Sequence, residues 1–201
     1  MTATAPSGVL SRLREYESWP TVDAIAITHM HIDHYGDLAA WLWGQLHVPA
    51  PGSVAPKLWL PPGGREVLYH LASRFHEVFE IEEYEDGTPF DAAGFTVSPV
   101  RVAHYTQPTW GFRIEAEGKV ASFSSDTGPT PALAELAAGA DVFVCEATLD
   151  EVESGSRGHL TAAEAEAAAA GARRLLLVHR PAELATPDGL ELAYDGLELE
   201  V

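Results

Sequence analysis

Residues 22–37 read VDAIAITHMHIDHYGD, and this stretch decides how the rest of the chain is interpreted. Its first seven residues are mostly apolar and rich in β-branched side chains, which is typical of a strand buried on both faces. The polar run HMHIDHYGD follows at once. Because binding and catalytic residues gather in loops at the ends of such strands, this junction is the first candidate for a functional site.

The polar run contains His29, His31, Asp33 and His34. Residues i and i+2 of an extended segment point the same way, so His29 and His31 can present their imidazoles to one metal ion. A turn after them would let Asp33 and His34 face a second ion. Imidazole nitrogen and carboxylate oxygen suit Zn²⁺ and similar divalent ions, and the single cysteine argues against a structural thiolate site.

Four more residues with suitable chemistry lie at the ends of predicted strands: His104, Asp126, Glu146 and His179. Open α/β sheets place their sites at the carboxyl ends of strands. Taken alone, each residue has an ordinary structural explanation, since a histidine at a strand end is commonly a surface group and Asp126 before Thr-Gly suits an Asx turn. Together with the first cluster, they are interpreted as parts of one site.

The order of predicted elements indicates one layered α/β unit. Helices are expected at 7–19, 36–46, 63–75, 130–138 and 161–174. Strands are expected at 22–28, 57–60, 78–84, 95–104, 109–118, 119–125, 141–148 and 175–179. The strands from residue 78 to residue 125 are separated by turn signals and are predicted to pair antiparallel in succession. Thr161 and Glu164 have capping-box spacing, which predicts where the last helix begins.

Composition limits the classes of protein that fit. The chain has 201 residues, of which 46% are hydrophobic, so it can form a real core. Its 30 acidic residues against 12 Lys and Arg give a formal charge of −18, which repels nucleic acids and anionic membranes. The sequence shows neither a cationic and apolar leader nor a long apolar stretch. We therefore expect a soluble cytoplasmic protein with no membrane contact.

The motifs resemble those of the metallo-β-lactamase superfamily of binuclear metallohydrolases, and most closely its ribonuclease Z and phosphodiesterase-like branch. The matching segments are THMHIDHYGDL, VRVAHYTQPTWGFRIE, ASFSSDTGP, DVFVCEATL, RGHLTAAEA and LLLVHRP. They extend from about Gly8 to about Arg180. The resemblance implies one domain over residues 1–201, folded as an αβ/βα four-layer sandwich with two mixed sheets flanked by helices.

The resemblance also implies roles for individual residues. The implied metal ligands are His29, His31 and His104 for one ion, Asp33, His34 and His179 for the other, and Asp126 as the bridge. The implied cofactor is a pair of divalent ions, Zn²⁺ before Mn²⁺ or Fe²⁺, with a bridging hydroxide as nucleophile. Asp33 could also orient that hydroxide, while His159 would protonate the leaving group and Glu146 would hold its imidazole. A surface histidine and an ordinary ion-paired carboxylate stay open for His159 and Glu146.

Two departures from the family pattern carry information. Members that process tRNA insert a long arm between the strands that match TWGFRIE and ASFSSDT, whereas this chain joins them with about AEGKV. With the charge of −18, this disfavours tRNA and favours a small-molecule ester or phosphodiester. Met1 also falls just before SGVLSRLREYES, so the domain is expected to be N-terminally shortened. That would leave 22–28 at a sheet edge, which a homodimer or another partner could cover.

The leading hypothesis is therefore a metal-dependent hydrolase that cleaves a small phosphodiester or related ester. A lactonase or thioesterase is the alternative with the same chemistry. A catalytically silent metal-binding relative, impaired by the shortened N-terminus, is the alternative from another class. Nucleic-acid binding ranks third because of the acidic charge.

Overall fold

The computed structural model describes residues 8–16, 19, 21–47 and 54–201. These residues form two compact units. The first runs to residue 85 and includes 90–94, and the second comprises 86–89 and 95–201. That residues 1–201 form a single domain stays a prediction. No helix in the described part of the chain is both long and apolar enough to cross a membrane.

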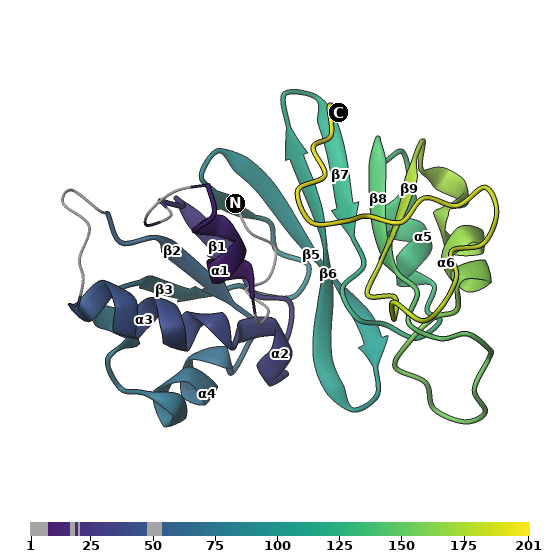
Figure 1. Ribbon diagram of the computed structural model, residues 1–201. Helices are drawn as coiled ribbons and strands as arrows, with labels where there is room; N and C mark the ends of the chain where they lie inside the picture. The colour runs from purple at the N-terminus through teal and green to yellow at the C-terminus, as the bar shows by residue number, and fades with distance from the viewer. Residues whose placement is uncertain (1–7, 17–18, 20, 48–53) are drawn as a thin grey trace. The chain divides into compact units, whose positions relative to one another are not determined.

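The first unit contains a parallel sheet in the order β1-β2-β3 (Figure 1). Its strands are β1 (Ala24–Ala26), β2 (Lys57–Leu60) and β3 (Glu80–Glu83). All three residues of β1 are fully buried, as the apolar sequence predicts, and β1 lies at one edge of the described sheet. The prediction that 78–84 begins the antiparallel run is wrong. β3 pairs parallel with β2 because the segment between them, with helix α4 (Gly64–Leu71), carries the chain back across the sheet.

Helices complete the core of the first unit. They are α1 (Val9–Leu13), α2 (Ile32–Tyr35), α3 (Asp37–His47), α4 and the 3₁₀ turn η1 (Phe75–Glu77). Helix α3 buries Leu38, Trp41 and Leu42, which lie on one helical face at i, i+3 and i+4. Trp43 lies outside that face and is 47% exposed. The first predicted helix, at 7–19, is confirmed over a shorter range, and residues 17 and 18 near its expected end lie outside the described residues.

The short strand β4 (Phe90–Ala92) also belongs to the first unit. The ring of Phe90 packs on Trp59 at 4.4 Å and on Tyr84 at 5.4 Å between centroids. This aromatic cluster holds Tyr84 in place, and its hydroxyl reaches the backbone at the end of β1.

The second unit contains strands in the order β5-β6-β7-β8-β9. Their bounds are β5 (Phe95–His104), β6 (Gln107–Ala116), β7 (Lys119–Phe123), β8 (Val142–Glu146) and β9 (Leu175–Val178). The pairs β5–β6 and β6–β7 are antiparallel as predicted, and β7–β8 and β8–β9 are parallel. Strands β5, β7, β8 and β9 therefore run in one direction, and their carboxyl ends meet at one edge of the sheet.

Two helices pack on this sheet, α5 (Ala132–Ala137) and α6 (Ala162–Ala168), the latter followed by η2 (Ala169–Gly171) (Figure 1). The predicted capping box is confirmed. The Oγ1 atom of Thr161 accepts a hydrogen bond from the Glu164 amide, and the Glu164 carboxylate accepts one from the Thr161 amide at 3.0 Å. This cap residue lies two positions after His159, so it also holds the chain that presents that histidine.

Candidate metal centre

The first group of predicted ligands follows β1 in the first unit. His29 is fully buried, and its Nε2 lies 3.1 Å from Nδ1 of His31. The rings of His29 and His34 are 4.0 Å apart between centroids. Asp33 has a side chain 62% exposed, with its Oδ2 3.4 Å from Nε2 of His34. The prediction that His29 and His31 point the same way is confirmed, and their roles as ligands stay predictions.

Two contacts position His29, the first residue of this group. One holds the backbone just before it, and the other orients its ring. The Tyr84 hydroxyl donates to the carbonyl of Ile27 at 2.9 Å, immediately before the motif. The Oγ1 atom of Thr28 lies 3.2 Å from Nδ1 of His29, which orients the ring so that Nε2 faces His31. A hydrogen bond at one ring nitrogen is the usual way in which proteins aim the other nitrogen at a metal ion.

The second group lies at the edge where the parallel strands of the second unit end. His104 ends β5, Glu146 ends β8, His179 directly follows β9, and Asp126 lies just beyond β7. The Oδ2 atom of Asp126 is 4.0 Å from Nε2 of His104 and 3.7 Å from Nε2 of His179. The ligand atoms of His104, Asp126 and His159 lie close enough to one another to hold one metal ion.

These spacings fit a metal ion. Zinc bonds to nitrogen and oxygen are about 2.1 Å, so two donors on one tetrahedral ion lie roughly 3.4 Å apart. The distances from Asp126, 4.0 Å to His104 and 3.7 Å to His179, exceed that spacing by about 0.6 and 0.3 Å. The Nδ1 atom of His104 lies 2.8 Å from the carbonyl oxygen of Gly158, which can only accept, so Nδ1 donates to it and Nε2, which faces Asp126, is the nitrogen available to a metal ion.

Glu146 makes the most hydrogen bonds of any side chain in this group. It is only 1% exposed, so these bonds satisfy a buried carboxylate. Its Oε1 accepts from the Thr127 amide at 2.9 Å and from Nδ1 of His159 at 2.8 Å. Its Oε2 accepts from the amides of Thr148 and Leu160 at 3.0 and 3.2 Å. The hydrogen bond that the His159 ring donates to Glu146 raises the pKa of His159 above its usual range, against the opposing effect of burial. Glu146 therefore holds His159, and the imidazole Nε2 is left for other contacts.

Thr148 belongs to this site and was missed in the sequence analysis. Its Oγ1 lies 2.6 Å from Nδ1 of His179 and 2.9 Å from both the carbonyl oxygen of His179 and Oε2 of Glu146. His179 has a φ of +53°, an uncommon conformation for a residue with a side chain. The sequence feature that could have indicated Thr148 is its position two residues after Glu146. The hydroxyl orients the imidazole of His179 so that its Nε2 faces Asp126.

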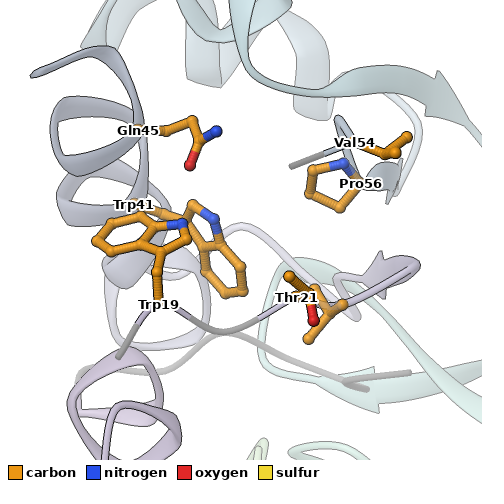
Figure 2. A pocket seen from close by; sticks show the side chains of 7 residues that line it. Trp19, Thr21, Trp41, Gln45, Val54 and Pro56 are labelled. Atoms are coloured by element: carbon orange, nitrogen blue, oxygen red, sulfur yellow. The ribbon is translucent and has the colours of Figure 1, made fainter. Parts of the chain in front are cut away.

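A small cavity lies in the first unit. Figure 2 shows it between Trp19 and Trp41 on one side and Val54 and Pro56 on the other. Its free volume of about 10 Å³ is room for about one water molecule. The residues that line it are Trp19, Thr21, Val22, Trp41, Gln45, Val54 and Pro56. None of the predicted site residues lines this cavity, so it is not a candidate substrate pocket.

A family model described as "Beta-lactamase superfamily domain" matches residues 4–180 of the chain. The chain belongs to the metallo-β-lactamase superfamily. An uncharacterized protein of Mycobacterium tuberculosis (strain ATCC 25618 / H37Rv) is 32% identical to it over 204 residues, which cover 94% of this chain and 74% of that protein. Ribonuclease Z of Mycobacterium marinum is 33% identical over 145 residues, which cover 61% of this chain and 50% of that enzyme.

Among solved structures, the metallo-β-lactamase fold protein YhfI of Bacillus subtilis has a TM-score of 0.82 and 21% sequence identity. The match covers 97% of this chain and 85% of YhfI. It confirms the predicted fold class, with two sheets flanked by helices. The chain is a metallohydrolase by family, and its histidine and aspartate side chains at the strand ends are donors of the kind that divalent ions need in this superfamily.

Proposed function

We propose that this protein is a metal-dependent hydrolase that uses a binuclear centre, with Zn²⁺ favoured over Mn²⁺ and Fe²⁺, to cleave a small phosphodiester or a related ester. One observation carries the proposal. The Asp126 carboxylate lies between the Nε2 atoms of His104 and His179, while the Nδ1 atom of each ring is in contact with another group of the protein. Imidazoles held at Nδ1 in this way present Nε2 in the orientation that a metal ion needs.

The proposed ligand set is His29, His31 and His104 for one ion, Asp33, His34 and His179 for the other, and Asp126 for both. Family membership and the nitrogen and oxygen donors of both groups support it. Two ions bound there would lower the pKa of a water molecule and neutralise charge on the oxygens of the reacting phosphoryl group.

The side chains around the ions supply orientation and proton transfer. His159 donates a proton from Nε2 to the leaving oxygen, because its Nδ1 is bonded to Glu146. The raised pKa of His159 keeps that proton available at higher pH than in an ordinary histidine. The exposed carboxylate of Asp33 orients the attacking water by accepting a hydrogen bond from it.

Two features support a small phosphodiester as the substrate. The ribonuclease Z relative is named for an activity on phosphodiester bonds, which favours that bond type. The β6–β7 hairpin has a loop of only Glu117 and Gly118, and the formal charge of −18 repels a polyanion, so tRNA and membranes are disfavoured as partners. A cytoplasmic location and a homodimer stay predictions.

The test compares turnover and metal content of the wild type and His159→Ala. Bis(p-nitrophenyl) phosphate, a γ-lactone and a thioester serve as substrates. We expect the phosphodiester to be hydrolysed fastest, and His159→Ala to lower that rate by about 10²- to 10⁴-fold with unchanged metal content. Faster cleavage of the lactone or the thioester would show that the substrate is not a phosphodiester and would assign that other substrate class instead. Absence of turnover in metal-loaded wild type on all three would favour a silent metal-binding relative.

A further inference from the structure

The hairpin between β5 and β6 carries a residue that the turn itself does not require. Tyr105 and Thr106 form its two-residue loop, since His104 pairs with Gln107. Tyr105 has a φ of +47°, where loops of this length normally place Gly, Asn or Asp because a large side chain is strained there. Glycine or asparagine would make the same turn more easily, so the tyrosine needs another explanation.

The aromatic ring of Tyr105 is held beside the proposed proton donor. It lies against Gly158 so closely that a Cβ at position 158 would be 2.3 Å from two ring carbons. Its centroid is 5.7 Å from that of His159, at an interplanar angle of 75°, and 5.2 Å from that of His104. The residue is nevertheless 51% exposed. A strained backbone and a glycine contact therefore hold a half-exposed aromatic ring next to His159.

We propose that Tyr105 is a substrate-binding residue, and that its ring receives a planar aromatic group on the leaving alcohol of the phosphodiester. The inference rests on the proposed function, in which His159 protonates the leaving oxygen. A group attached to that oxygen projects among the rings around His159. Those of His104 and His179 are committed to metal binding in the proposed centre, so Tyr105 provides the aromatic surface for the substrate. Aromatic rings attract one another by stacking and edge contacts more strongly than they attract aliphatic rings of similar size.

The competing explanation is that Tyr105 only supports Gly158 and, through it, His159. In that case removal of the Tyr105 ring would weaken the binding of every substrate alike and would destabilise the fold. Tyr105→Asn separates the two explanations, because asparagine tolerates the left-handed backbone and lacks the ring. Tyr105→Phe keeps the ring. Glu117→Asn is the matched control, since Glu117 occupies the β6–β7 hairpin loop with a φ of +53°.

The experiment measures binding to the metal-loaded protein by calorimetry with two non-hydrolysable probes, methyl(2-phenylethyl)phosphinate and methyl(2-cyclohexylethyl)phosphinate, in which a CH₂ group replaces the leaving oxygen. They differ only in whether the ring is planar and aromatic. We expect the wild type, Tyr105→Phe and Glu117→Asn to prefer the phenyl probe. Tyr105→Asn should lower that preference by about 2- to 10-fold, with a Tm equal to or above that of the wild type.

Three results would overturn the proposal. Equal binding of both probes by the wild type would remove the aromatic preference and leave the proposed function standing. An equal loss of affinity for both probes in Tyr105→Asn, together with a lower Tm, would show that the ring only supports the loop. Failure of the wild type to bind either probe, with no hydrolysis of bis(p-nitrophenyl) phosphate, would overturn the proposed function and this inference together.

Discussion

Replacement of Glu146 by glutamine should destabilise the protein far more than its small change in shape suggests. The carboxylate accepts from the amides of Thr127, Thr148 and Leu160 and from the ring of His159, with donors at both oxygens. A glutamine amide has only one acceptor oxygen. If that oxygen keeps Thr127 and His159, the NH₂ group must face the amides of Thr148 and Leu160.

The amide N–H of buried Leu160 and that of half-buried Thr148 would lose their acceptor, at about 1–3 kcal/mol each, so the free energy of unfolding should fall by about 2–6 kcal/mol. Urea denaturation of the metal-free proteins at pH 7 measures this change. Glu117→Gln is the matched control, because Glu117 is exposed and should change stability by less than about 0.5 kcal/mol. A loss below about 0.5 kcal/mol in Glu146→Gln would refute the argument that Glu146 organises this part of the fold.

Three further predictions follow from the same contacts. Because Glu146 raises the pKa of His159, Glu146→Gln should move the titration midpoint of that imidazole to lower pH in the metal-free protein, as followed by NMR; an unchanged midpoint would count against the contact. Thr148→Val should weaken Zn²⁺ binding by about 10- to 100-fold in a chelator competition, with Thr148→Ser close to wild type, and equal affinities would sink this role. Gly158→Ala should cost about 1–3 kcal/mol of stability by crowding Tyr105, and most of that loss should disappear in combination with Tyr105→Asn. Equal losses in both backgrounds would contradict that contact.

The sequence predicted those parts of the fold that depend on local patterns. The fully buried β1 follows from the apolar run before His29, and the start of α6 follows from the spacing of Thr161 and Glu164. The antiparallel pairing predicted for 78–84 was wrong. An exposed, alternating strand has the same pattern of polar and apolar residues whether its neighbour is parallel or antiparallel. Its direction is set by the connection through α4, which is a tertiary feature.

The candidate site was predicted where residue chemistry alone is distinctive. Histidine and aspartate at strand ends, such as His104 and Asp126, carry that information in their type and position. Thr148 and Tyr105 do not, since threonine and tyrosine are common in loops and hairpins. Their importance comes from contacts with distant residues, the ring of His179 in one case and Gly158 in the other. Such contacts depend on how loops fold over a sheet edge and leave no local pattern.

The central claim is that this chain holds a binuclear metal centre, and metal content per chain tests it most directly. Elemental analysis of protein purified without added metal or chelator should give about two equivalents of zinc, manganese or iron. His104→Ala should retain clearly less metal than the wild type, because it removes a ligand whose Nε2 faces Asp126. Less than about half an equivalent in the wild type, not restored by adding Zn²⁺ or Mn²⁺, would contradict the account.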